Sequence, residues 1–475
     1  MSVIVLLADG ARTDTLARTV ESGALPALAR LAQEGGSYEL TSAFPSVTGP
    51  AYTPFLMGRF PGSVGLPGLR WYDRSRQACS FPGYCRSYVG YQMGAMDGDL
   101  DPDSATIFEL VPDSAAALSI ITRGLPRRRQ MASLTPRSAL RAARTHFRGD
   151  VTGWLRVDRE ISDRVVEGTR SGESPFVFAA FTGVDKASHA GGHESPRVLD
   201  ALRIVDDTVA NLRQDLEARG QWESTRLWIT SDHGHSRVTR HEDLARVIAG
   251  FGNRVLSHPW VYRLRADVAV MVSGNAMAHV YVDLDQRHRP FWRGMSERGR
   301  ELAEQLSVRD SVDLVLIPTS GTSCDVWSGG SGGGGVGGGR ATVCVRGCRF
   351  SYEPADGDPL GLGGALRDLD DADAHRATLA TDYPDSIVQI ARLASSDRAG
   401  DIILSASRDW DFRARYEPIP HVSSHGALHR DHMLVPLLAS HAAARAPRRT
   451  ADIMPSALMA LGLPVPAGLD GVSFI

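Results

Sequence analysis

Short apolar segments alternate with longer amphipathic segments along this chain, and this alternation is the feature that most restricts its fold. Residues 3–8 and 176–181 are apolar runs of the kind that form buried strands, and residues 226–230 are a further short example. Residues 16–34 and 195–220 have helical periodicity and stop at glycine. Repeated β-loop-α units of this kind predict an α/β fold with a mostly parallel central sheet and helices on both faces.

The last part of the chain continues the same pattern. We predict a helix at residues 386–394, strands at 401–405 and 434–438, and a helix at 451–461. We assign these elements to the same central sheet. Because 475 residues exceed what a single compact core usually holds, we expect residues 1–475 to form one domain that carries large insertions.

Two segments interrupt the alternation, and we interpret them as insertions. Residues 113–158 contain eight arginines and no acidic residue between Arg123 and Arg148, which favours a solvated helical face over a surface that attracts an anionic substrate. Residues 236–384 form a second, cap-like insertion. Within it, residues 328–339 are nearly all glycine, and this composition predicts a mobile loop.

The charge and hydropathy of the chain exclude some classes of partner. With a formal net charge of -3 and a pI of about 6.6, the chain has no positive field that attracts a nucleic-acid polymer or an anionic membrane. No segment approaches the roughly 18 apolar residues of a membrane helix, and the apolar start lacks the basic residues of a signal peptide. We expect a soluble, cytoplasmic protein that acts on a small molecule. The sequence does not predict its oligomeric state.

Carboxylate and imidazole side chains follow several of the predicted strands. Because the carboxyl ends of strands form the sites of open sheets, these side chains are expected to lie together. Both types are ligands that zinc prefers, with manganese or iron as alternatives. Three carboxylates and three histidines are enough for two divalent ions, which can stabilise the entering and leaving oxygens of a displacement at phosphorus. The candidate ligands are Asp9, Asp185, His189, Asp232, His233 and His425.

Thr48 is the candidate nucleophile. It lies in Phe44-Pro-Ser-Val-Thr48-Gly-Pro, a turn of small residues that enters a predicted helix ending near Gly58. Free backbone amides at a helix N-terminus favour an anion, and metal coordination lowers the pKa of a hydroxyl group. Taken alone, however, Thr48 is most simply a helix cap.

The motifs occur in a fixed order along the chain. They are Asp9 after the first strand, Thr48 in Val-Thr-Gly-Pro, Asp185-x-x-x-His189, Ser231-Asp-His-Gly234 and Ser424-His-Gly426. This ordered set resembles the alkaline phosphatase superfamily and is most similar to its type I phosphodiesterase and nucleotide pyrophosphatase branch. The resemblance extends from Val3 to Val472, outside the two insertions.

The resemblance implies an alkaline-phosphatase-like catalytic domain with two divalent metal ions. It implies that Thr48 attacks phosphorus and forms a phosphothreonine intermediate. One metal would be held by Asp9, Thr48, Asp232 and His233, and the other by Asp185, His189 and His425. We expect a phosphodiesterase or nucleotide pyrophosphatase. The alternatives are a phosphomonoesterase or phosphonate hydrolase with the same site, and an inactive metal-binding scaffold.

One position departs from the branch pattern. Members usually have an asparagine that contacts a phosphoryl oxygen, just before a Tyr-Asp pair, and here Leu69 stands at that position ahead of Tyr72 and Asp73. Arg70 could bind the phosphoryl group instead, because a guanidinium can hold two oxygens. Alternatively, Arg70 pairs with Asp73 or faces solvent. The departure leaves the substrate class open.

Other histidines lie near the motifs. His421, His429 and His432 surround His425, and any of them could be the ligand. We prefer His425 because Gly426 follows it, and we expect His429 and His432 to line the rim or pack locally. Three more histidines follow the other motifs and are interpreted as surface residues, with contacts to ligands or substrate as the alternative: His193, His235 and His241.

Overall fold

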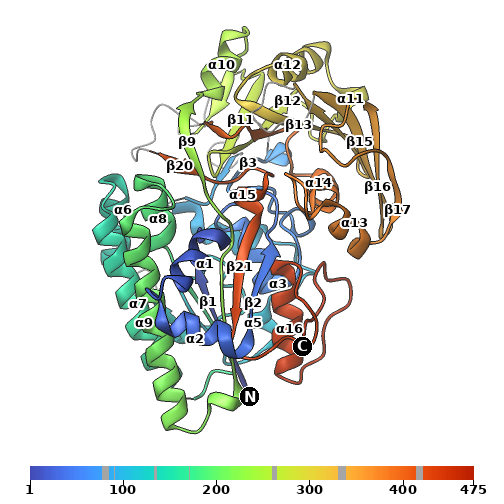
Figure 1. Ribbon diagram of the computed structural model, residues 1–475. Helices are drawn as coiled ribbons and strands as arrows, with labels where there is room; N and C mark the ends of the chain where they lie inside the picture. Colours follow the sequence, from blue (N-terminus) through green and yellow to red (C-terminus); the bar gives the residue numbers. More distant parts are fainter. Residues whose placement is uncertain are drawn as a thin grey trace.

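The computed structural model describes residues 1–475 except 77–84, 90, 133–135, 171, 259–264, 330–337 and 413–420. Most of the glycine-rich stretch at residues 328–339 therefore lies outside the described residues. The described chain contains a seven-stranded sheet, a nine-stranded sheet and two smaller ones. In Figure 1 the seven-stranded sheet occupies the lower half of the molecule and the nine-stranded sheet the upper half.

The seven-stranded sheet is the central α/β sheet that the sequence predicts. Its order is β2 (Ser37–Thr41), β21 (Leu434–Ala439), β8 (Thr225–Thr230), β1 (Ser2–Ala8), β7 (Phe176–Phe181), β5 (Ala115–Ala117) and β6 (Gln130–Ala132). β1 pairs in parallel with β7 and β8, and β5 pairs in parallel with β6 and β7. Only β21 pairs antiparallel, with β2 and β8. The predicted mostly parallel sheet is confirmed.

Both faces of β1 are buried because its side chains alternate between two hydrophobic cores. Val3, Val5 and Leu7 pack into one core, and Ile4 and Leu6 into the other. A parallel strand covered on both faces has a continuous apolar sequence rather than an alternating one. The apolar N-terminal run is therefore explained by its central position in the sheet.

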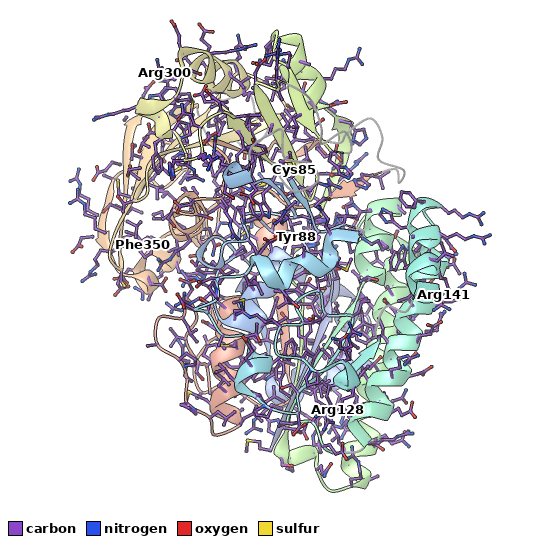
Figure 2. All side chains as sticks on the ribbon, turned by 180° about the vertical axis from the view of Figure 1, so that it is seen from behind. Cys85, Tyr88, Arg128, Arg141, Arg300 and Phe350 are labelled. Atoms are coloured by element: carbon purple, nitrogen blue, oxygen red, sulfur yellow. The ribbon has the colours of Figure 1, made fainter. Side chains whose placement is uncertain are left out.

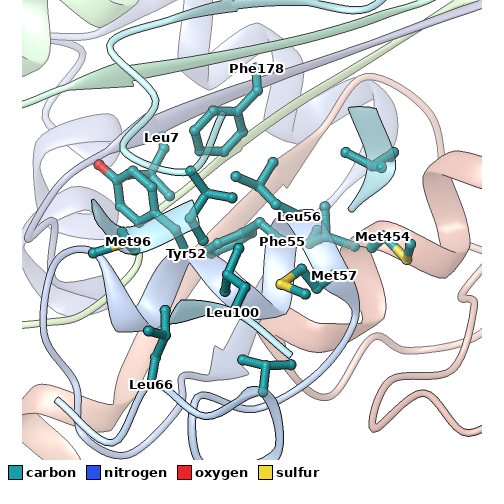
Figure 3. Packing of buried hydrophobic residues seen from close by; sticks show 14 of the residues in the cluster. Leu7, Tyr52, Phe55, Leu56, Met57, Leu66, Met96, Leu100, Phe178 and Met454 are labelled. Atoms are coloured by element: carbon teal, nitrogen blue, oxygen red, sulfur yellow. The ribbon is translucent and has the colours of Figure 1, made fainter. Parts of the chain in front are cut away.

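Helices cover both faces of the central sheet. One face is covered by α1 (Thr13–Glu21), α2 (Pro26–Gly35), α7 (Val151–Arg170), α8 (Gly183–Gly191) and α9 (Pro196–Ala218) (Figure 1). The other is covered by α3 (Thr53–Met57), α5 (Ile107–Leu110) and α16 (Ile453–Ala460). Figure 3 shows this second core, in which the rings of Tyr52 and Phe178 lie 5.6 Å apart.

The nine-stranded sheet contains one strand that we had assigned to the central sheet. Its order is β10 (Val255–Ser257), β11 (Val268–Ser273), β12 (Met277–Val282), β18 (Ile402–Ala406), β13 (Val312–Ser320), β14 (Ser323–Ser328), β15 (Gly339–Arg346), β16 (Arg349–Asp356) and β17 (Leu366–Leu369). All of these strands except β18 come from residues 236–384. Whether that segment acts as a cap over substrate stays a prediction.

The assignment of the strand at residues 401–405 to the central sheet was wrong. β18 pairs antiparallel with β12 and β13, and α14 (Ser386–Ala394) packs on the same sheet. All five residues of β18 are buried, as they would be in a central parallel strand. The apolar pattern of residues 401–405 indicates that the strand is buried, but it does not identify the strands with which it pairs.

Residues 113–158, which we interpreted as an Arg-rich insertion within the domain, contribute to the central sheet. They supply β5 and β6 to the edge of the central sheet, then α6 (Pro136–Phe147) and the start of α7. Strands of three residues are too short to show a periodic pattern, so the sequence did not predict them. Arg141 is 56% exposed and pairs with Glu160, and Figure 2 shows it at the outer edge of the molecule. These features agree with a solvated arginine-rich face.

The remaining elements are short or lie around the nine-stranded sheet. They are β3 (Arg70–Tyr72), β4 (Cys85–Ser87), β9 (Ser236–His241), β19 (Asp409–Asp411), β20 (Ser423–Ser424), α4 (Met96–Asp99), α10 (Leu244–Gly250), α11 (Phe291–Gly294), α12 (Glu297–Ser307), α13 (Asp371–Thr378) and α15 (Arg430–Met433). Within the described parts of the chain, no helix combines the length and apolar character needed to cross a membrane. A cytoplasmic location stays a prediction.

Asp313 on β13 should make the stability of the fold depend on pH. Burial raises the pKa of Asp313 to about 6, although Tyr383 donates a hydrogen bond to its carboxylate at 2.8 Å. Because this pKa is higher in the folded than in the unfolded chain, the stabilising contribution is full below about pH 4 and is lost as pH rises through 6. An Asp313→Asn variant keeps an acceptor for Tyr383 but does not ionise.

We expect the free energy of unfolding of the wild type, relative to Asp313→Asn, to fall by about 3 kcal/mol between pH 4 and pH 7.5. Urea unfolding curves of both proteins at several pH values measure this difference. If the two pH profiles ran parallel, Asp313 would not retain its proton in the folded protein.

Candidate active site

The predicted site residues lie at the carboxyl ends of three adjacent strands. Asp9 directly follows β1, Asp232 follows β8, and Asp185 lies in α8 after β7. Since β8, β1 and β7 are parallel neighbours, their carboxyl ends meet at one edge of the sheet. Thr48 and His425 come to the same edge from loops outside these strands. The structure thus brings together side chains that are up to 416 residues apart, Asp9 and His425.

The first group of side chains surrounds the hydroxyl of Thr48. The Thr48 Oγ1 atom lies 3.2 Å from Asp9 Oδ1 and 3.1 Å from His233 Nε2. His233 Nε2 is also 3.4 Å from Asp9 Oδ1 and 3.5 Å from Asp232 Oδ2. Asp9, Asp232 and His233 are buried and present ligand atoms within 4.8 Å of one another. These four residues are those that the resemblance assigns to one metal.

Thr48 does not cap a helix. The short 3₁₀ turn that follows begins at Pro50, its N-cap residue is Gly49, and it has no side-chain cap. The Thr48 hydroxyl instead contacts Asp9 and His233. The capping alternative is therefore wrong, and the hydroxyl is directed into the carboxylate and imidazole cluster.

The second group of side chains surrounds Asp185. Asp185 Oδ1 lies 3.2 Å from His189 Nε2 and 3.6 Å from His425 Nε2. The imidazole rings of His425 and His233 are stacked with centroids 3.7 Å apart, so the two groups are adjacent. The residues that the resemblance assigns to the second metal therefore also lie together.

The hydrogen bonds of three histidines fit cation binding. The Nδ1 atom of each ring faces a backbone carbonyl: that of Gly234 for His233, Ser423 for His189 and Ser46 for His425. A carbonyl oxygen only accepts, so the hydrogen of each neutral ring must be on Nδ1, and Nε2 carries a free lone pair. These lone pairs point at carboxylate oxygens, an arrangement that a metal ion between them would stabilise.

A carboxylate oxygen in the site lacks a hydrogen-bond partner. Asp232 Oδ1 accepts from the Gly10 amide at 3.3 Å, but the buried Oδ2 atom has no partner among the described residues. Leaving a buried carboxylate oxygen unpaired is costly unless a cation pairs with it. Together with the bare imidazole nitrogens, this orphaned oxygen shows that the residues present fit divalent metal ions.

The charges of the site are poorly compensated by the protein alone. Burial raises the pKa of Asp9 well above its usual range, and the charges of Asp232 and Asp185 raise it further. Burial also raises the pKa of Asp232. Burial opposes ionisation of Asp185 too, but the ammonium of Lys186 holds its pKa well below the usual range. Divalent ions would supply the positive charge that these buried carboxylates require.

The structure places two further residues in the site that the sequence interpretation missed. His235, which we interpreted as a surface residue, is completely buried, and its Nε2 atom lies 2.9 Å from Asp185 Oδ1. Its Nδ1 atom faces the Ser423 hydroxyl, which itself donates to the Ser236 carbonyl at 2.9 Å. The hydrogen of the neutral ring is therefore on Nδ1, and Nε2 presents a lone pair beside the ligand atoms of Asp185, His233 and His425. Lys186 Nζ contacts Asp185 Oδ2 at 2.7 Å. Lys186 is the only lysine in the chain, and this rarity was the signal available.

Asp158 holds the helix that carries Asp185 and His189. It is fully buried in α7 and accepts hydrogen bonds from the amides of Thr182 at 3.0 Å and Gly183 at 2.8 Å. These amides begin α8 and would otherwise be unpaired. The position of the second group of ligands therefore depends on a contact between two helices.

Arg70 lies on β3 and is 8% exposed. Its guanidinium donates to the Ser87 hydroxyl and to the Val272 carbonyl, both at 3.3 Å. The solvent-exposed alternative for Arg70 is therefore wrong. Its binding to a phosphoryl group stays a prediction.

The neighbouring histidines separate into two kinds. His429 and His432 are buried and pack against each other with ring centroids 3.9 Å apart, as expected for local packing. His421 stacks on His189 at 4.4 Å and lies 3.9 Å from Asp411. His241, which is 40% exposed, also contacts Asp411. His421 therefore lies against His189, a predicted ligand of the second metal.

Solved structures with a similar fold include a phosphonoacetate hydrolase and ectonucleotide pyrophosphatases / phosphodiesterases. Phosphonoacetate hydrolase from Sinorhizobium meliloti 1021, in complex with phosphonoacetate, has a TM-score of 0.59 and 14% identity over 97% of this chain and 96% of that chain. Human ectonucleotide pyrophosphatase / phosphodiesterase 5 has a TM-score of 0.57 and 14% identity over 98% and 96%. An inactive variant of murine ectonucleotide pyrophosphatase / phosphodiesterase 5, in complex with AMP, has a TM-score of 0.56 and 13% identity over 98% of this chain and 96% of that chain.

These similarities define the class: an alkaline-phosphatase-like α/β fold with a buried cluster of aspartates and histidines that could bind metal. The sequence profile of the type I phosphodiesterase / nucleotide pyrophosphatase family matches residues 3–324, more than half of the chain. The chain belongs to this family of metal-dependent enzymes and is a phosphoric ester hydrolase. No curated protein matches it in sequence.

Proposed function

We propose that the chain is a two-metal phosphodiesterase that acts through a phosphothreonine intermediate on Thr48. The observation that carries this proposal is the position of the Thr48 hydroxyl, within 3.2 Å of both Asp9 and His233 in a buried cluster. A hydroxyl in such surroundings is suited to attack rather than to capping or packing.

Asp9, Thr48, Asp232 and His233 would hold one divalent ion, and Asp185, His189 and His425 the other. Zinc is the expected ion because the donors are carboxylate oxygens and imidazole nitrogens, and manganese or iron would also suit them. Such ions lower the pKa of a bound hydroxyl and stabilise charge on the entering and leaving oxygens. Lys186 would keep Asp185 ionised and oriented, and His235 would add an imidazole nitrogen to the same group of ligand atoms.

In the first step, Thr48 Oγ1 forms a bond to phosphorus and the ester oxygen of the leaving group departs. In the second step, water attacks the phosphothreonine, and the threonine hydroxyl is restored. In the first step the proton of Thr48 passes to solvent. In the second step the P–O bond to Thr48 breaks, and a proton from the attacking water restores the hydroxyl. No separate protein base is assigned.

Diester hydrolysis is the first choice because the family comprises phosphodiesterases and nucleotide pyrophosphatases. A phosphonate hydrolase is the second candidate, favoured by the fold similarity to phosphonoacetate hydrolase. A phosphomonoesterase would use the same site. The small-molecule partner is in each case a phosphorus ester or phosphonate.

The substrate class is tested by comparing three substrates with the metal-loaded protein. We expect kcat/KM for bis(p-nitrophenyl) phosphate to exceed that for p-nitrophenyl phosphate by roughly tenfold or more, with no turnover of phosphonoacetate. Faster cleavage of the monoester would instead assign a phosphomonoesterase. If elemental analysis found bound metal but none of the three substrates reacted, the inactive metal-binding scaffold would hold.

A further inference from the structure

The turn between β11 and β12 connects the nine-stranded sheet with the candidate active site. It consists of Gly274, Asn275 and Ala276, and we call these residues the β11–β12 turn. The Ala276 amide donates to the carbonyl of His425 at 3.0 Å, and the Ser424 hydroxyl donates to the carbonyl of Gly274 at 3.0 Å. The turn is therefore bonded to the segment that carries His425, a proposed ligand of the second metal.

Gly274 lies at a position where a side chain does not fit. Its φ is 61°, and a β-carbon placed on it would lie 2.8 Å from Val47 Cγ2, 2.9 Å from the His425 carbonyl oxygen and 3.0 Å from His425 Nδ1. Val47 is the residue before Thr48. The backbone of the turn is therefore packed against both the ring of His425 and the residue that precedes the nucleophile.

The approach is equally close on the side of the ligand. A β-carbon placed on Gly426, which has a φ of 115°, would lie 2.8 Å from the Ser273 carbonyl oxygen and 3.4 Å from Gly274 Cα. The glycine that follows His425 thus has a physical role, because it allows the end of β11 to approach the backbone beside the ligand.

Asn275 extends the contact toward a second proposed ligand. The buried amide group of Asn275 contacts Nδ1 of His421, and the ring of His421 stacks on that of His189 with centroids 4.4 Å apart. The Asn275 carbonyl also accepts from the Phe412 amide at 2.6 Å. The β11–β12 turn is therefore bonded to the segment of one second-metal ligand and contacts the ring that packs on another.

The turn has firm support, whereas His425 has little of its own. β11 pairs with β12 along all six of its residues, and β12 pairs in turn with β18. Val270 and Val280 bury these strands in a hydrophobic core. His425 lies between the two-residue strand β20 and α15, and it forms an isolated β-bridge with Asn275. A side chain on an irregular segment keeps its geometry only if its neighbours hold it.

We propose that the β11–β12 turn positions His425 for binding of the second metal, and that Gly274 and Asn275 are positioning residues of the site. The inference rests on the proposed function, and it gives the nine-stranded sheet a role in holding a ligand. Contacts that orient a metal ligand from outside typically change metal affinity by about 10-fold to 100-fold.

Two alanine substitutions in hairpin turns of the same sheet test the proposal. Gly274 and Gly347 both have a φ of 61°, so alanine brings the same backbone strain to each. Beyond its chain neighbours, however, a β-carbon on Gly347, between β15 and β16, would have no described atom within 4 Å. We expect Gly274→Ala to raise the Kd of the second metal by roughly tenfold or more, and Gly347→Ala to leave both metal affinities unchanged.

Cobalt titration of the metal-free protein, followed by visible absorption, measures the two affinities without turnover. A His425→Ala variant identifies the absorption that belongs to the second site. In Gly274→Ala this absorption should need roughly tenfold more free cobalt, while the absorption of the first site should appear as in the wild type. If Gly274→Ala bound both cobalt ions as tightly as Gly347→Ala does, the proposal would be overturned.

Asn275→Gly is the second variant, and it decides if thermal unfolding shows that Gly274→Ala does not fold. Glycine adopts the φ of 63° readily, so this change removes only the side-chain contact with His421. Its second-metal Kd should rise roughly tenfold, and an unchanged Kd would overturn the proposal. If the wild type binds two metals but hydrolyses no phosphate ester, the proposed function fails while the titration still judges the turn. A wild type without cobalt uptake that depends on His425 would refute the role of the turn.

Discussion

Replacing Thr48 with alanine should abolish turnover of phosphate esters, by roughly 10⁴-fold or more in kcat. The reason is that, among the described residues, the Thr48 hydroxyl alone contacts both Asp9 and His233. The three other side chains of the first group remain, so the metal content should stay nearly intact. Steady-state rates on an aryl phosphodiester and elemental analysis of the purified protein measure the two effects separately.

The matched control is Thr48→Ser, which keeps a hydroxyl and removes only a methyl group. This variant should retain a measurable fraction of the activity. Acid quenching of the wild type during turnover should also trap phosphate on Thr48, and mass spectrometry would locate it. Unimpaired hydrolysis by Thr48→Ala would rule out Thr48 as the nucleophile.

Removing the divalent metal should have the second-largest effect, because it should abolish activity and also weaken the fold. Without cations, Asp9, Asp232 and Asp185 remain buried close to one another, and Asp232 Oδ2 has no partner among the described residues. A metal present at 100 times its Kd stabilises the folded chain by about 2.7 kcal/mol per site. Chelation should therefore lower the Tm by several degrees, as calorimetry would show.

Re-addition of zinc, manganese or iron to the chelated protein is the control, and at least one ion should restore both rate and Tm. An Asp232→Asn variant should bind about one metal equivalent fewer than the wild type, because it loses the unpaired carboxylate oxygen. A protein shown to be metal-free that kept its rate and its Tm would contradict the two-metal site.

Much of the site could be predicted from the sequence because its residues occupy fixed positions relative to strands. Asp9 follows β1 directly and Asp232 comes two residues after β8, and parallel strands deliver such residues to one edge. The position of His235 could not be predicted in this way. A histidine three positions after a ligand has no pattern that reveals burial, and only the contact with Asp185, from another strand connection, shows its place.

The fold, too, could be predicted from the sequence only in part. The fully apolar run of β1 identified a central strand, since a strand covered on both faces must be apolar throughout. The fully buried β18 has the same pattern but belongs to the nine-stranded sheet. β5 and β6 were missed because three residues are too few for any periodicity. The local pattern of apolar residues indicates whether a strand is buried. Which strand it pairs with depends on contacts between residues far apart in the chain.

The sequence by itself determined the class of fold and the ordered metal-type motifs, because strand periodicity and the spacing of Asp185 and His189 are local properties. Only the tertiary structure decided which side chains face Thr48. The Thr48 hydroxyl contacts Asp9 and His233, and the ring of His233 stacks on that of His425. These contacts join segments far apart in the chain, and they form only when the sheet and its loops pack together.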